Sequence, residues 1–435
     1  MKRYFPTAIG TLLWCALAAS AQTPTANQAS HGMTLQEAEQ LALKNNPQIT
    51  VSKLLALAQG QVSREVRSVE FPQATGNLTA VEPREGGTRI TAGVLNAPNV
   101  FERAAGGVTF GQLITDFGRT GNLVASANLN EKAAAQNQIA TQADITLAVD
   151  QAFYKALAAQ ALLNVAQQTV AARQTTADQV EALTKAKLKS DLDLSFANVN
   201  LAQAKLLLLD AENNKATAFA NLNTLLGFER MQSYLLVDES GAPLPAAPTN
   251  QDQLVDLALH SRPDLAALEY RSESAEKFRR AEHDLLRPSV SALAAVGGTP
   301  VRVPQLTSWY GAVGVNVSIP LFNGFQFNAR AKEADYRAAA AQQQVRDLRD
   351  RIARDVDVTY LQAQSSFQRV NVTAQLLAQA NLALDLAKTR YELGLGSIVE
   401  LSQALLQQTE AAIGNTNARY EYLSPLSSLR FQTGQ

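Results

Sequence analysis

The sequence predicts a mainly helical, elongated chain made of two tandem copies of one unit, each with a long helical hairpin and two β-strands. Three observations indicate this fold. Gly and Pro are sparse, at 23 and 15 of 435 residues. Neither occurs from Asn122 to Leu226 or from Phe325 to Leu393, and one helix over the second stretch would be about 100 Å long. The two halves also resemble each other. These features argue against an all-β sandwich or a doubly wound sheet.

The first 21 residues predict a secretory signal peptide. Lys2 and Arg3 give a positive start, an apolar run extends from Ile9 to Ala18, and Ala19-Ser20-Ala21 offers small residues for cleavage before residue 22. The only cysteine, Cys15, lies in this segment. We therefore expect a mature chain without a thiol, and so without disulfides or thiolate metal sites. Residues 22–33 are expected to form a polar linker.

Internal similarity defines the two repeats. Leu41-Ala42-Leu43 with Pro47 recurs 216 residues later, and the offset falls to 207 from Asp116 onward, as between Ser190 and Ser397. The first copy therefore holds nine extra residues between Pro72 and Asp116. The predicted order is a first repeat over 34–226, a breaker-rich linker over 227–249, a second repeat over 250–424 and a C-terminal tail over 425–435.

Each repeat is predicted to open with a capped helix and to continue into strands. Thr34 with Glu37, and Asn250 with Gln253, are typical of helix N-termini. The Gly-rich stretches 72–118 and 288–324 follow. Apolar and polar residues alternate from Val313 to Ile319, which suits a strand with one apolar face. We expect two strands per half and four per chain.

Helical hairpins are predicted over 119–226 and 325–424. The first is expected to reverse at Lys187 to Asp193, which aligns with the Gly-rich turn Gly394 to Ser397. Apolar residues recur at spacings of four, which predicts coiled-coil-like packing between neighbouring helices. Examples are Val149, Phe153 and Leu157 in the first half and Ile352, Val356 and Tyr360 in the second.

Charge and motifs exclude several functions. Lys plus Arg is 38 and Asp plus Glu is 39, so no basic excess is available for nucleic acid. The three His residues lack ligand spacing, and no phosphate-binding loop or nucleophile-plus-base constellation occurs. We expect no enzyme activity, metal or cofactor. Energy for any transport must come from a partner.

A membrane role would depend on the strands. Beyond residue 22 no apolar run reaches the length of about 18 residues that a spanning helix needs. Four strands cannot close a barrel, and an open sheet edge is not tolerated in hydrocarbon. Several chains must then share one barrel, with two giving eight strands and three giving twelve. The long helices would project into an aqueous compartment.

Four motifs stand in order along the chain: Leu41 to Pro47, Asp116 to Arg119, Leu321 to Gly324 and Tyr391 to Leu401. Through them the sequence resembles the outer-membrane factor (TolC-type) family of tripartite efflux pumps and type I secretion. The resemblance covers essentially the whole mature chain. It implies a homotrimer in the cell outer membrane, with a shared 12-stranded β-barrel and a periplasmic α-barrel. It also implies a passive duct docked onto a periplasmic adaptor protein and an energised inner-membrane pump, proton-driven or of the ABC type.

The resemblance also suggests functional residues. Two turns match the adaptor-docking tips of the family, although the glycines are needed for a tight turn in any case. These residues are Leu188, Lys189 and Ser190 in the first half and Gly394, Leu395, Gly396 and Ser397 in the second. Glu400 matches an acidic residue that constricts the periplasmic entrance, and Asp193 is its first-half equivalent. Gln403 replaces a second acid often found there. Three carboxylates would form a cation-favouring ring, whereas the alternative is an ordinary solvated helix surface.

The leading hypothesis is an outer-membrane channel subunit that passively exports small toxic molecules through a gated entrance near Glu400. The same duct could serve type I protein secretion, because substrate choice lies largely with the inner-membrane partner. A structural coiled-coil protein of the envelope is a distant alternative, and it predicts no membrane strands.

Overall fold

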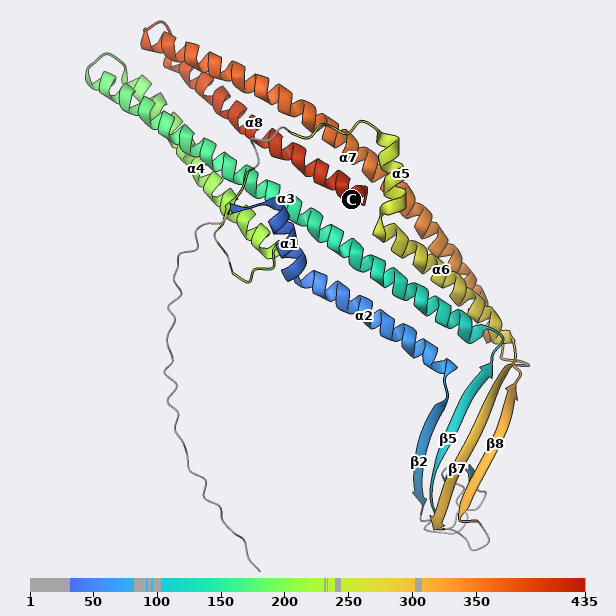
Figure 1. Cartoon of the computed structure of the whole chain (residues 1–435). Coiled ribbons are helices and arrows are strands. Elements are labelled where there is room, and N and C mark those ends of the chain that lie inside the picture. The colour runs from blue at the N-terminus through green and yellow to red at the C-terminus, as the bar shows by residue number, and fades with distance from the viewer. Residues whose placement is uncertain are drawn as a thin grey trace, which may run out of the picture.

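The computed structural model describes residues 32–81, 91–92, 95–96, 103–230, 232, 234–238, 244–301 and 307–434. The expected signal peptide and residues 22–31 of the expected linker lie outside these ranges. The described chain is elongated, with a sheet at one end and two helical tips at the other (Figure 1). None of its described helices is both long and apolar enough to cross a membrane.

The two halves contain the same series of helices, which confirms the predicted repeat. In each half the four helices have 11, 21, 67 and 35 residues. The first half has α1 (Leu35–Asn45), α2 (Pro47–Arg67), α3 (Arg119–Lys185) and α4 (Asp191–Leu225). The second has α5 (Gln251–Ser261), α6 (Pro263–His283), α7 (Gln326–Glu392) and α8 (Ile398–Gln432). We call two residues twins when they are related by the offset of 216, for first-half residues up to 81, or by the offset of 207, for first-half residues from 103 onward.

One antiparallel sheet joins the halves. Its order is β2-β5-β7-β8, so β2 and β8 are the edges. The strands are β2 (Gln73–Val81), β5 (Arg103–Thr115), β7 (Ser289–Val301) and β8 (Trp309–Ser318). The four predicted strands are thus confirmed. Two pairs of two-residue strands, too short to show a periodicity, were not predicted: β3 (Thr91–Ala92) with β4 (Leu95–Asn96), and β1 (Gly32–Met33) with β6 (Leu235–Leu236).

The sheet has one apolar and one polar face, because side chains alternate along each strand. The apolar face is open to the surroundings, with Leu78 92% and Val313 89% exposed. It also includes Val108, Phe110, Val296, Val315 and Val317. The opposite face carries small polar residues, among them Thr75, Asn77, Thr109, Ser291 and Asn316.

Side-chain caps begin the short helices as expected. The Thr34 hydroxyl accepts the Glu37 amide at 3.3 Å, and the Glu37 carboxylate accepts the Thr34 amide at 3.0 Å. Asn250 accepts the amide of Gln253. The C-terminus differs from expectation, because α8 continues through Pro425 to Gln432 in place of a tail. Proline removes one helical hydrogen bond, and burial of Leu429 against α5, α6 and α7 holds the last turns in place.

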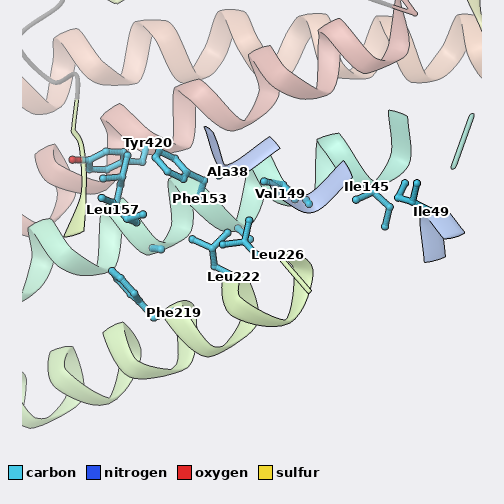
Figure 2. Close-up of a cluster of buried hydrophobic side chains, with 14 residues drawn as sticks. Ala38, Ile49, Ile145, Val149, Phe153, Leu157, Phe219, Leu222, Leu226 and Tyr420 are labelled. Atoms are coloured by element: carbon cyan, nitrogen blue, oxygen red, sulfur yellow. The ribbon is translucent and has the colours of Figure 1, made fainter. Parts of the chain in front are cut away.

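The largest core lies where α1, α3, α4 and α8 meet (Figure 2). Val149, Phe153 and Leu157 of α3 are 0%, 2% and 3% exposed, and Phe219 and Leu222 of α4 pack with them. In the second half Ile352 and Val356 are equally buried. Apolar spacing of four along the sequence therefore identified the packed faces of both long helices.

Asp150 is a carboxyl group buried beside this core. Its side chain is 6% exposed, and its Oδ1 atom has no hydrogen-bond partner among the described residues. Burial raises the pKa of Asp150 to about 7; Glu39 of α1 adds to this rise, while Ser427 and Arg430 of α8 oppose it. In the folded protein Asp150 is therefore mostly protonated below about pH 7.

We predict that Asp150→Asn stabilises the protein above neutral pH. The unfolded carboxyl has a pKa of about 4, below the folded value. Between about pH 4 and pH 7 the folded state therefore binds one proton more than the unfolded state. The free energy of unfolding of the wild type then falls as the pH rises through this range. Urea unfolding at about pH 5 and about pH 8 measures the effect.

Its twin Asp357 provides the matched control. Asp357 is half-exposed and accepts a hydrogen bond of 2.7 Å from Gln251. Asp357→Asn should give no comparable gain at the higher pH. Identical pH slopes for the wild type and Asp150→Asn would contradict the assignment.

Candidate functional site

The two helical tips come together at the end of the molecule opposite the sheet (Figure 1). A buried apolar cluster joins them, which we call the tip cluster. It contains residues from both hairpins: Ala177, Val180, Ala197, Leu201, Tyr391, Ile398, Leu401 and Leu405. Both predicted docking turns therefore belong to one surface.

The two turns have the same backbone geometry. Lys187 and its twin Gly394 adopt left-handed φ angles of 59° and 72°. In the first turn the Leu188 amide donates to the Leu183 carbonyl at 2.9 Å, and in the second Leu395 donates to Arg390 at 2.8 Å. This is the Schellman arrangement that ends helices. The twin leucines Leu188 and Leu395 are 70% and 68% exposed, so each tip presents an apolar side chain.

Asp193 caps the helix that leaves the first tip. The Ser190 hydroxyl accepts the Asp193 amide at 3.2 Å, and the Asp193 carboxylate accepts the Ser190 amide at 3.0 Å. Hydrogen bonds from Ser190 hold the pKa of Asp193 below its usual value, outweighing burial, and Tyr391 and Lys189 lower it further. Asp193 is therefore an ionised capping group of its own hairpin.

Glu400, the twin of Asp193, makes a different contact. Its amide is capped by Ser397 at 3.1 Å, but its carboxylate accepts from Arg390 Nε at 3.1 Å. Arg390 also donates to the Leu395 carbonyl. A Cβ added to Gly396 would lie 3.2 Å from both Arg390 and Glu400, so glycine leaves room for this pair. Each chain thus brings an ion pair to the predicted entrance position, and the exposed Gln403 follows one turn later.

Tyr391 links the second tip to the first. Its hydroxyl donates to Asp193 Oδ1 at 3.3 Å. Lys189 Nζ donates to the Tyr391 carbonyl at 3.3 Å and lies 3.8 Å from the centre of the ring, a cation–π contact. Burial, followed by the charge of Asp193, raises the pKa of Tyr391 to about 12. The phenol therefore stays protonated and keeps donating.

Two further links join the hairpins below the tips. Asn200 of α4 donates to the Ser402 hydroxyl of α8 at 2.9 Å. Arg173 of α3, only 7% exposed, donates to the Leu405 carbonyl at 2.6 Å and to the Thr409 hydroxyl at 2.8 Å. Both partners of Arg173 are uncharged, and burial lowers the pKa of its guanidinium to about 10.

All ten residues singled out from the sequence lie at this end of the molecule. Sequence reasoning missed Arg390, Tyr391, Arg173 and the Asn200–Ser402 pair. Arg390 precedes Glu400 by ten residues across a tight turn, so aligning the two arms of the hairpin could have paired them. No such signal exists for Arg173, whose partners are more than 200 residues away in the chain. Within the described ranges, no group of His, Cys, Asp or Glu side chains is arranged to hold a metal ion.

Sequence and fold comparisons agree along the chain. The sequence matches the family of outer membrane efflux proteins over residues 38–228 and 254–435. TolC of Vibrio cholerae serotype O1 is 24% identical over 95% of this chain and 94% of its own length. The outer membrane efflux protein BepC of Brucella suis biovar 1 is 23% identical over 95% of this chain and 88% of its own. A crystal structure of CusC superposes with a TM-score of 0.80 at 19% identity, over 92% of each chain.

We predict that Asp193→Ala loosens the first tip far more than Glu400→Ala loosens the second. The Asp193 carboxylate accepts the backbone amide of Ser190, the residue that caps its helix, whereas the Glu400 carboxylate accepts from Arg390. Loss of such a capping bond costs about 1 kcal/mol, which corresponds to about fivefold faster local amide exchange. Hydrogen exchange at residues 190–194 and 397–401 measures both effects. Because its folded pKa is depressed, the Asp193 contribution is present above about pH 4 and is lost as the pH falls through that pKa. Equal loosening of both tips would contradict the assignment.

Proposed function

The chain belongs to the outer membrane efflux protein family and is a TolC-type efflux channel protein of the Gram-negative outer membrane, and on this premise we propose that it is the passive duct of a tripartite efflux system. The family is one of channels and not of enzymes. Small toxic molecules would leave through a homotrimer whose tips dock on a periplasmic adaptor and an energised inner-membrane pump. The observation that carries the proposal is the pairing of two exposed tips at the end of the chain opposite the sheet.

The tip surface suits a docking and gating role. Leu188 and Leu395 are exposed apolar side chains at the two turns, and Leu192, Leu393 and Val399 next to them are exposed as well. Exposed apolar groups rimmed by polar ones are typical of protein contact sites. The adjacent Arg390–Glu400 pair would face the entrance, so movement of the tips would carry charged groups into or out of the passage.

The sheet edges support self-association. Within the chain, β5 of the first half pairs with β7 of the second. The twin of β5 is β8 and the twin of β7 is β2, and these are the two unpaired edges. The same contact repeated between chains would therefore join β8 of one copy to β2 of the next. Closure of three copies would leave no exposed edge.

The helices support the same arrangement. Helix α6 packs against both α3 and α7, whereas its twin α2 packs against α3. The repeat assigns the missing neighbour of α2 to α7 of another copy. Exposed apolar residues on α2 fit this assignment, since they would be covered there: Val51, Leu54, Leu55 and Val62 are 54%, 59%, 64% and 42% exposed.

The repeat predicts the register of the strands between copies. Phe110 pairs with Ala294 in the chain, and their twins are Val317 and Leu78. We expect Val317→Cys with Leu78→Cys to form covalent trimers on oxidation in the membrane, detected on a non-reducing gel. Val313→Cys with Leu78→Cys lies on the same face but is displaced by four residues, about 13 Å, and should not cross-link. The reverse pattern would rule out the proposed register.

The entrance pair predicts opposite changes in ion selectivity. Arg390→Ala would leave the Glu400 carboxylate unpaired and shift the channel toward cations, while Glu400→Ala would leave Arg390 unpaired and shift it toward anions. Reversal potentials of reconstituted trimers in a KCl gradient measure both shifts. Glu392→Ala, at an exposed acid before the same turn, is the control and should move the potential less. Shifts of the same sign would place the pair outside the conduction path.

A further inference from the structure

We propose that Tyr310 and two glycines beside it set the size limit for solutes at the end of the duct that the strands form. The inference rests on the proposed function, because the polar face of the sheet lines a water-filled passage only if several chains close into a barrel. Strand β8 starts at the end of the sheet away from the helices (Figure 1), and Tyr310 is its second residue.

Tyr310 lies on the polar face of the sheet. It pairs with Gly297 of β7, which pairs in turn with Gly107 of β5. Side chains alternate along a strand, so Tyr310 points away from the apolar face that carries Trp309 and Phe110. Among the described strand residues, Tyr310 is the only aromatic one on the polar face. Its orientation therefore affects the width of a passage there more than that of its smaller neighbours.

Two glycines leave room for the ring to lie along the sheet. A Cβ added to Gly297 would overlap the ring carbon that bears the hydroxyl, and a Cβ added to Gly107 would overlap the hydroxyl oxygen itself. Since neighbouring strands are about 4.8 Å apart, the side chain extends from β8 across β7 toward β5. The hydroxyl is buried and has no hydrogen-bond partner among the described residues. Tyr310 thus lies flat against the wall of the sheet.

The flat orientation keeps the ring out of the passage. A methyl group at position 107 would take the place of the hydroxyl, and a side chain that is displaced moves to another staggered rotamer. The sheet backbone blocks one side of the ring, so the free space is on the open side of the polar face. Turning there would also return an unpaired hydroxyl to water, which favours the move. Three rings, one per chain of the proposed trimer, would then narrow the passage at one level.

The arrangement occurs once in each chain. The twin of Tyr310 is Arg103 and the twin of Gly297 is Val81, so the second copy of this position has neither the aromatic residue nor the glycine. The backbone plan shared by the halves therefore does not require a glycine at this place in the sheet. The tyrosine and its glycine belong together as a feature of the second half.

A cysteine deeper in the proposed passage provides the readout. Asn316 is exposed on the same face of β8, six residues or about 20 Å further from the strand end. Asn316→Cys should be the only thiol of the mature chain, because Cys15 lies in the expected signal peptide. Intact cells are treated with a small maleimide or with a polymer-bearing maleimide, and the ratio of the two labelling rates is measured. Labelling from outside the cell does not require the helical entrance to open.

We expect Gly107→Ala to lower the ratio of bulky to small labelling at least about threefold, because passage of large solutes follows the diameter of a pore. Gly111→Ala is the control on the same strand and face, where an added Cβ meets nothing within 4 Å. It should leave the ratio unchanged. Adding Tyr310→Ala to Gly107→Ala should restore the ratio. An unchanged ratio in Gly107→Ala, or a fall that persists without the tyrosine, would overturn the inference.

A second variant decides the matter if Gly107→Ala fails to assemble into trimers. Gly314→Tyr puts the same ring on the same strand and face, but opposite Leu293, where no glycine leaves room for it. The ratio should fall as in Gly107→Ala, and an unchanged ratio would overturn the inference. If the small maleimide does not label Asn316→Cys in the otherwise wild-type chain, the polar face lines no aqueous passage, which counts against the proposed channel function instead.

Discussion

The contact between the first and second halves of the chain determines most of the structure. Each half presents surfaces that it cannot cover alone: a strand edge, one side of a short helix and one side of a long hairpin. Inside the chain the second half covers the first through β5 with β7, α3 with α6 and α3 with α8. The opposite surfaces, on β2, β8, α2 and α7, stay open. A repeat that satisfies one of its two contacts requires further copies to satisfy the other.

The halves share a backbone plan but have diverged in side chains where that plan must perform different tasks. Equal helix lengths keep the two tips level, and the left-handed turn residue is Gly394 in one tip and Lys187 in the other. Leucine precedes the first turn at position 183 where arginine precedes the second at 390. Arg390 therefore gives Glu400 an ion-pair partner that Asp193 lacks, and Asp193 caps its helix instead. Asp150 is buried, whereas its twin Asp357 is half-exposed and paired with Gln251. The side chains that surround each twin within the chain, and not the shared backbone, distinguish the two members of a pair.

Most of the fold could be predicted from the sequence because its signals are local or periodic. Stretches without Gly or Pro predicted α3, α4 and α7, and the alternation of apolar and polar residues predicted β8. The change of offset between the repeats located the longer strand connection of the first half. The contacts of the site were harder to predict. Glu400 was identified through the family resemblance and Asp193 through its place in the repeat, but the partner of each depends on which side chain lies across a turn or on another hairpin. Arg173 looks like an ordinary helix-surface arginine in the sequence, and only packing of α3 against α8 buries it.

We propose that copies of the chain join by repeating the contact between its own halves. Electron cryomicroscopy of the protein in lipid nanodiscs tests this most directly. We expect three chains around one axis, with six similar hairpins, β8 beside β2 of the next copy and α2 covered by the neighbouring α7. A different number of chains, or neighbours that meet through any other strands and helices, would contradict it.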